Sequence, residues 1–332
     1  MNHLITEVSK IENLLKTSAV KTITMYRMNF DGKRAYVTTE PFNVYSGLTG
    51  ALSAATFKGN IESKRIGKWR DKMIASLGGQ EAQEGYLQTL ADFGTLTHSA
   101  LVTIKNEGKL DWALEQDQAY AYFENSAKEN GIIPNTGVIR SQVFDYCKAI
   151  AAILQFCYDN VTEIYAIESM CKSDELMIAT PIDFCASIKT KEGDVKMSVN
   201  LKTSSQIGNH HREQVSVEKY LWNQTYPDFQ MDKTAVLRNK DWSLKKGIPT
   251  YEFEVLDKET ENKFLTNALD RLRICKADQN STYYNFKSEV QLFTGITKLG
   301  EAPKIETKTL EALFKESQNT DQLSLANTNE NN

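Results

Sequence analysis

The residues best placed to do chemistry are a carboxylate, Asp183, and a polar pair, Asn200 and Lys202. The turn-forming residues 191–194 lie between them, which predicts a hairpin with Asp183 in one strand and the pair in the next. Because side chains alternate along a strand, Asn200 and Lys202 share one face while Leu201 faces the core. Such a site suits Mg²⁺, which prefers oxygen ligands, and a lysine beside the ion would orient or deprotonate an attacking water.

Five short segments extend this pattern along the chain. They are Gly94-Thr95-Leu96-Thr97-His98, Glu168, Thr180-Pro181-Ile182-Asp183, Asn200-Leu201-Lys202-Thr203, and His211-Arg212-Glu213-Gln214 followed by Tyr220. In this order they resemble the motifs of the PD-(D/E)xK nuclease superfamily, in particular its RecB-like, phage-type exonuclease branch. The resemblance extends over about residues 45–275, with Thr180 where the family usually has glycine.

The resemblance implies an α/β fold of the restriction-endonuclease type, with a mixed central sheet flanked by helices and a helical N-terminal section. It also implies that the protein hydrolyses DNA phosphodiester bonds from a strand end with Mg²⁺ or Mn²⁺, in phage recombination or replication. The implied metal ligands are His98, Asp183, Asn200 and Glu168, with Lys202 orienting the nucleophilic water and with Gln214 and Tyr220 contacting the phosphate or positioning Lys202. DNA is the implied partner, and the oligomeric state stays open.

Position 200 departs from the family pattern, because asparagine stands where the family has Asp or Glu. Asparagine offers an oxygen but no charge, and one charge at about 2–4 Å is worth several kcal/mol at an effective dielectric constant near 20. Three explanations stay open: an engineered substitution, a natural nucleic-acid- or protein-binding module on a nuclease scaffold, or compensation by a neighbouring acid such as Glu168. From position 200 alone we expect weak Mg²⁺ binding and little cleavage, with a large gain on Asn200→Asp. A coincidental pattern in an unrelated α/β protein is the remaining alternative.

Hydrophobic patterning predicts the elements that must position these residues. The first part of the chain, to about residue 160, is mostly helical: we expect helices over 3–17, 80–106 with a break near Gly94, 116–130 and 141–159, a hairpin over 21–39, and a basic helix ending near 76. The second part, about 161–280, forms the mixed-sheet core: we expect strands over 163–168, 176–188, 195–201, 234–242 and 250–256, and helices over 212–222 and 258–276. Together they predict one domain over residues 1–315, followed by a disordered tail over 316–332 that is rich in polar residues.

Composition limits the class of protein. The chain has 332 residues, a net charge of −4, 41% hydrophobic and 25% charged residues, which is typical of a globular protein and excludes collagen, coiled coils and wholly disordered chains. Its five cysteines show no CxxC spacing, which favours reduced thiols over a zinc or redox site. No apolar run reaches the roughly 18–20 residues that span a bilayer, and the N-terminus lacks a signal-peptide core. We therefore expect no membrane contact and a cytoplasmic location, in a bacterium or a phage-infected host.

DNA binding requires a local excess of positive charge in a chain that is acidic overall. Two segments have such an excess: residues 58–72 contain six basic residues against two acidic ones, and residues 233–247 contain five against one. We expect these two segments to flank the DNA-binding cleft.

Overall fold

The computed structural model describes residues 20–30, 33–55, 79–107, 111–130, 135–204, 206–241, 250–278, 289–293 and 305–316, with residue 318 and short pieces of 68–76. The helix predicted over 3–17, most of the basic segment 58–72 and almost all of the tail predicted over 316–332 lie outside the described residues.

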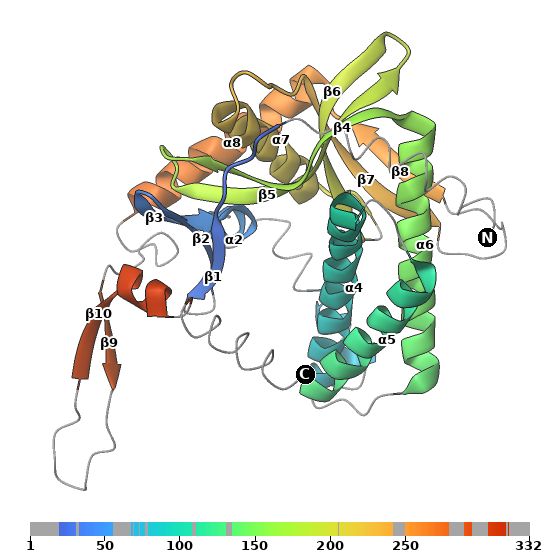
Figure 1. The fold of residues 1–332 in the computed structure, drawn as a ribbon, viewed down its shortest axis with the longest axis horizontal. Helices are drawn as coiled ribbons and strands as arrows, with labels where there is room; N and C mark the ends of the chain where they lie inside the picture. Colours follow the sequence, from blue (N-terminus) through green and yellow to red (C-terminus); the bar gives the residue numbers. More distant parts are fainter. Residues whose placement is uncertain are drawn as a thin grey trace, which may run out of the picture.

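A mixed sheet of eight strands runs through the described part of the chain (Figure 1). Its strands are β1 (Tyr26–Phe30), β2 (Lys33–Thr39), β3 (Phe42–Gly47), β4 (Val161–Ser173), β5 (Ile178–Thr190), β6 (Gly193–Lys202), β7 (Lys233–Asp241) and β8 (Thr250–Val255). Neighbours follow the order β1-β2-β3-β5-β6-β7-β8, and β4 pairs with β5. Among these described strands the β3–β5 and β6–β7 pairs are parallel and the others antiparallel. The predicted α/β class with a mixed central sheet is therefore confirmed.

Helices cover both faces of this sheet. They are α2 (Leu48–Ala54), α4 (Gln80–Glu107), α5 (Trp112–Glu129), α6 (Thr136–Asn160), α7 (Asn209–Thr225) and α8 (Lys258–Ala277). Figure 1 shows α4, α5 and α6 on one side of the sheet and α7 and α8 on the other. Each side has its own hydrophobic core, with Ile153 and Phe156 of α6 buried in one and Trp222 and Leu269 of α7 and α8 in the other. The sheet is thus held between two apolar layers, as in other α/β folds.

Three helices begin where the sequence provides a capping side chain. Asp111, Asn135 and Asp257 precede α5, α6 and α8, and each accepts hydrogen bonds from backbone N–H groups of the first helical turn. Such caps satisfy donors that have no partner inside the helix. They explain why α5 begins at Trp112, earlier than the predicted start at residue 116.

The N-terminal section differs from the prediction in two further ways. α4 runs without a break through Gly94, because one glycine costs only about 1 kcal/mol relative to alanine inside a helix that packing holds in place. Residues 42–54, for which no element was predicted, form β3 and α2; β3 pairs with β2, its neighbour in the chain, and with the distant β5, which local sequence does not reveal. The first 160 residues therefore contribute three strands to the central sheet. Downstream, β9 (Glu289–Phe293) and β10 (Ile305–Thr309) form a hairpin that was not predicted.

The described residues end in a short helix that packs on the first strands. Residues 310–316 are helical, and Leu310 and Phe314 are buried. The ring of Phe314 lies 5.5 Å from that of Tyr26 and 6.2 Å from that of Phe42, measured between centroids. This helix thus braces the β1–β3 region that forms one side of the site described below.

Two other sequence-based expectations can be compared with the described residues. None of the described helices is long and apolar enough to cross a membrane. The five cysteines are free, and Cys157, Cys171 and Cys185 are buried.

We predict that Phe314→Ala lowers the free energy of unfolding by about 3 kcal/mol, because it removes a buried aromatic ring and leaves a cavity. Lys315→Ala is the matched control: the Lys315 side chain is 70% exposed, and the expected change is within about 0.5 kcal/mol. Urea denaturation of the two variants measures both values. Equal stabilities of the two variants would show that the C-terminal helix does not brace the sheet.

Candidate metal centre

The site forms where β5 changes its partner strand. At its start β5 pairs with β3 through Ile178 and Ala179, and from Phe184 onward it pairs with β6. β4 occupies the other edge of β5 over this length, so β3 and β6 share one edge. On that edge, no described strand pairs with residues 180–183. The sheet is therefore open at its centre, between β3 and β6.

Asp183 lies in this opening. Its side chain accepts a hydrogen bond that a backbone carbonyl would accept in a paired strand. Its Oδ2 accepts the backbone N–H of Leu201 at 2.6 Å, and the residue is 5% exposed. The Leu201 side chain is buried in the core on the α4–α6 side, as the alternation along β6 predicted. Asn200 and Lys202 flank it and line the opening.

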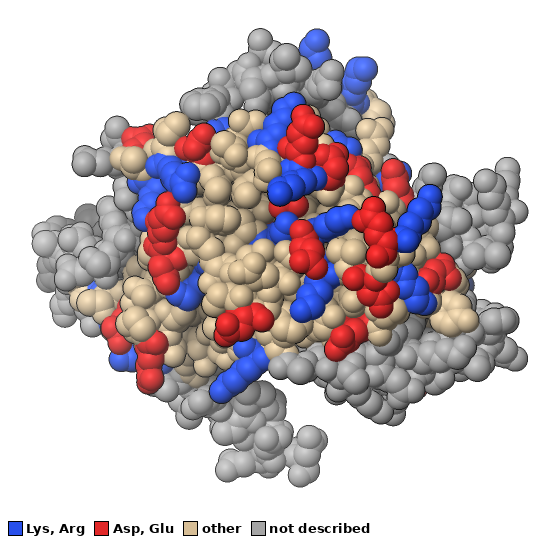
Figure 2. All heavy atoms as spheres, turned by 90° about the horizontal axis from the view of Figure 1, so that it is seen from above, with Lys and Arg blue, Asp and Glu red and all other residues tan. Residues whose placement is uncertain are grey.

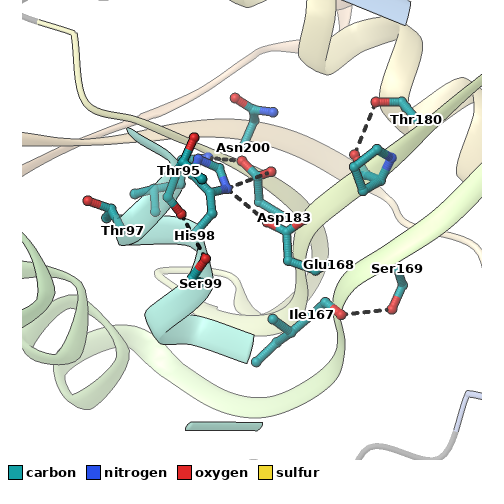
Figure 3. A network of polar contacts seen from close by, with 12 residues as sticks. Thr95, Thr97, His98, Ser99, Ile167, Glu168, Ser169, Thr180, Asp183 and Asn200 are labelled. Carbon is teal, nitrogen blue, oxygen red and sulfur yellow. Dashed lines mark hydrogen bonds and ion pairs between the residues drawn. The ribbon is translucent and has the colours of Figure 1, made fainter. Parts of the chain in front are cut away.

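Glu168 and His98 complete a group of three converging side chains (Figure 3). Glu168 lies in β4, opposite Asp183, between the pairs that Ile167 and Ser169 make with β5. Its φ angle of 45° is rare for a residue other than glycine, and such strain typically costs about 1–3 kcal/mol and clusters at functional sites. His98 reaches the group from α4: its Nδ1 lies 2.8 Å from Oε1 of Glu168 and 3.3 Å from Oδ1 of Asp183.

These three residues could hold a metal ion. One ligand atom from each of His98, Glu168 and Asp183 lies within 4.8 Å of the others, and an imidazole with two carboxylates is a donor set that divalent ions use. Asn200 lines the same cleft, and its buried Oδ1 has no hydrogen-bond partner among the described residues. An unpaired buried carbonyl oxygen beside two carboxylates fits a cation. The chemistry of the group leaves the identity of the metal open.

The electrostatics of the three residues favour a positive charge among them. Burial opposes protonation of His98, but the charges and hydrogen bonds of Asp183 and Glu168 outweigh it and raise the pKa of the imidazole to about 10. Burial would also raise the pKa of Asp183, but the charge and hydrogen bond of His98, with the charge of Lys202, lower it. At neutral pH a proton on His98 therefore balances the carboxylates, and a metal ion must displace that proton.

A second group of side chains, centred on Glu218 of α7, adjoins the first. Lys202 Nζ donates to Gln214 Oε1 at 3.0 Å, and Gln214 Nε2 donates to Glu218 Oε1 at 2.7 Å. Asn200 Nδ2 donates to both oxygens of Glu218, at 3.0 and 2.9 Å. Burial and the charge of Asp183 raise the pKa of Glu218 to about 8, against the opposing effects of Lys202 and the two amides. Glu218 thus connects the predicted ligand Asn200 to the predicted water-orienting Lys202.

Both groups lie on one wide cleft of about 750 Å³. Its lining includes His98, Glu168, Asp183, Asn200, Lys202 and Gln214, and also Arg27, Lys33 and Arg34 from β1 and β2. The three cations reach the cleft from the β1–β3 side of the opening in the sheet. A metal-binding group and three basic side chains therefore share one cleft.

The cleft does not include every residue that the sequence predicted for it. Tyr220 is absent from the lining: its hydroxyl accepts a hydrogen bond from Gln224, and its ring packs against the core on the α7–α8 side. Six residues along a helix separate it from Gln214 by about 240°, since each residue turns about 100°, so the two face different directions.

The basic segments 58–72 and 233–247 do not line the cleft in the parts that the structure describes. In the second segment Arg238 is paired with Glu252, with 2.6 Å between Nε and Oε2. Most of segment 58–72 and the end of segment 233–247 lie outside the described residues, so for them the expectation stays a prediction. Among the described residues, Arg27, Lys33 and Arg34 line the cleft instead.

Sequence reasoning missed Glu218 and the three cations of β1 and β2. Glu218 follows Gln214 by four residues and lies between Val217 and Leu221, both fully buried. A carboxylate on the buried face of a helix is a signal that could have been found. The three cations flank the predicted turn of the first hairpin. Basic residues are common on solvent-exposed hairpins, so the local sequence does not mark them as part of a site.

No protein-family model matches the chain, and no curated protein matches it in sequence.

We predict that Mn²⁺ binding at neutral pH releases close to one proton, because His98 has a pKa near 10 before the ion binds and must be neutral to ligate. Isothermal titration calorimetry in buffers of different ionisation enthalpy measures this release. His98→Asn should bind Mn²⁺ more weakly and release no proton. Tight binding by the unmodified chain without proton release would contradict the exchange of a His98 proton for the ion.

Proposed function

We propose that this protein is a metal-dependent nuclease that hydrolyses phosphodiester bonds of DNA, acting from a strand end as the family resemblance implies. The observation that carries the proposal is the convergence of His98, Glu168 and Asp183 in a cleft that Lys202 also lines. The restriction-endonuclease-like fold belongs to the same proposal.

Each side chain of the cleft has a role in this reaction. Bound Mg²⁺ or Mn²⁺ supplies Lewis acidity toward the phosphoryl group and acidifies a ligated water. His98, Glu168 and Asp183 hold the ion, and Asn200 offers a neutral oxygen to it. Lys202, fixed by its hydrogen bond to Gln214, orients the attacking water and offsets negative charge at the phosphate.

The charges of the cleft support an anionic polymer as substrate. Arg27, Lys33 and Arg34 line the cleft together with the metal-binding group, from the β1–β3 side, where they can contact phosphates of a bound polymer. Figure 2 shows that acidic and basic side chains are interspersed over the face seen from above, without a single basic field. The cations that line the cleft thus supply local positive charge in a chain with a net charge of −4.

The environment of Asn200 bears on the three explanations for this residue. Glu168 and Glu218 both lie in or beside the site, so neighbouring acids are available to compensate for the neutral side chain. This supports an active enzyme, whereas the engineered and the non-catalytic explanations both require the site to have lost its activity.

We predict that the unmodified chain shortens linear DNA in the presence of Mg²⁺ or Mn²⁺ and leaves covalently closed circular DNA intact. Asp183→Asn and Lys202→Ala should each reduce the rate by about 10²–10³, because the first removes a charged ligand of the metal and the second removes a positive charge that acts at the reacting phosphate. Lys189→Ala, an exposed residue near the far end of β5, is the control and should retain full activity. DNA binding without any cleavage under these conditions would instead identify a non-catalytic binding module.

We predict that Arg27→Ala and Arg34→Ala each weaken DNA binding for all sequences. Each change should also reduce the slope of log affinity against log salt by about 1, as expected when one phosphate contact is lost. Lys191→Ala, on the exposed β5–β6 turn, removes the same charge away from the cleft and should leave the slope unchanged. Fluorescence anisotropy with labelled DNA at several salt concentrations measures the slopes. Equal slopes for all three variants would remove the β1–β2 cations from the binding surface.

A further inference from the structure

Glu218 is a buried carboxylate whose surroundings are unusual for an acid. The residue is 2% exposed, and three amide contacts donate to it: two from Asn200 Nδ2 and one from Gln214 Nε2. This is the pattern of a carboxylate that accepts on both oxygens. Burying a carboxylate is unfavourable, so the position of Glu218 next to two residues of the cleft needs an explanation other than packing.

The contact with Glu218 determines which end of the Asn200 side chain is available to the cleft. With Nδ2 directed at Glu218, Oδ1 is the remaining polar atom, and it is buried without a hydrogen-bond partner among the described residues. Figure 3 shows Asn200 beside His98 and Asp183. A buried carbonyl oxygen without a donor is destabilising unless something else satisfies it, and a cation bound to the neighbouring group would do so.

We propose that Glu218 is a positioning residue, which accepts hydrogen bonds from Asn200 and so holds the carbonyl oxygen of Asn200 toward the metal centre. We call these two side chains the amide–acid pair. The inference rests on the proposed metal-dependent function and identifies how its site works with a neutral residue at position 200. The family resemblance places a carboxylate at position 200 of β6; here that position holds an amide, and the carboxyl group of Glu218 on α7 lies one hydrogen bond away.

The same carboxylate also positions the lysine. Gln214 donates to Glu218 through Nε2 and accepts from Lys202 through Oε1, so the orientation of its amide is fixed from both ends. Glu218 therefore sets the placement of a ligand and, through Gln214, of the residue that orients the water.

The proposal predicts effects of substitutions at positions 200 and 218 that differ from those expected from position 200 alone. Asn200→Asp by itself replaces the amide that donates to both oxygens of Glu218 with a carboxyl group, so the contact that fixes the two side chains is lost. Glu218→Gln by itself lets the new amide donate to Oδ1 of Asn200 and draw that oxygen away from the centre. In the double variant Asn200→Asp with Glu218→Gln, the new amide donates to one oxygen of Asp, and the other oxygen faces the centre.

The test compares Mn²⁺ affinity, measured by titration calorimetry, and DNA cleavage for the unmodified chain, both single variants and the double variant. Glu218→Gln should lower the affinity about 10- to 100-fold, the usual effect of losing a partner that orients a ligand. The double variant should recover most of this loss, and it should exceed Asn200→Asp alone in both affinity and rate. Glu115→Gln changes another buried acid, hydrogen-bonded to Tyr146 in the helical layer, and should leave both measurements unchanged.

Three results would overturn the inference: unchanged affinity in Glu218→Gln, Asn200→Asp alone matching or exceeding the double variant, or no Mn²⁺ binding by the unmodified chain. Melting curves in the absence of metal identify any variant that fails to fold. The metal readout is independent of DNA, so recovered Mn²⁺ affinity without cleavage in any variant would count against the nuclease proposal and leave the pair intact.

Discussion

The parting of β5 from β6 is the constraint on which the rest of the site depends. If β5 stayed paired with β6 along its whole length, the backbone donors of β6 would have partners on β5, and the N–H of Leu201 would not need a side-chain acceptor. Here β5 pairs with β3 at one end and with β6 at the other, and the carboxylate of Asp183 satisfies the N–H of Leu201 between them. The same side chain thus stabilises the open backbone and presents its second oxygen to His98.

The charges of the ionisable side chains in the site balance one another, which explains why these groups can be buried together. Buried carboxylates must be paired with positive charge or with hydrogen-bond donors. Protonated His98 balances Asp183 and Glu168, and Glu218 accepts hydrogen bonds from the amides of Asn200 and Gln214. A divalent ion adds the positive charge that the carboxylates favour and releases the proton of His98. The arrangement is therefore suited to exchanging a proton for a metal ion without leaving a buried charge unpaired.

Local pattern was enough to predict the parts of the site that lie on regular strands. Alternation along β6 placed Asn200 and Lys202 on one face, and the turn at residues 191–194 placed Asp183 in the neighbouring strand. The position of His98 beside Asp183 came from the resemblance to a nuclease motif. It depends on how α4 packs across the sheet, which no local pattern encodes.

The features that were not predicted from the sequence also depend on tertiary structure. Whether Glu218 faces solvent or the sheet is decided by the rotation of α7 about its axis, and the polar neighbours Gln214 and Lys219 favoured the solvent. The break expected at Gly94 did not occur, because packing of a long helix outweighs the cost of a single glycine. β3 forms a hairpin with β2, which directly precedes it, but its second partner, β5, lies in a distant part of the chain, and local sequence does not reveal that pairing.

The most direct test of the central claim is an X-ray structure of crystals grown with Mn²⁺, with anomalous data collected at a wavelength where manganese scatters strongly. The account predicts an anomalous peak between His98, Glu168 and Asp183, about 2.0–2.3 Å from one ligand atom of each. It also predicts that the carbonyl oxygen of Asn200 faces this peak. A peak elsewhere in the molecule, or none at saturating Mn²⁺, would contradict the assignment of this cleft as a metal centre.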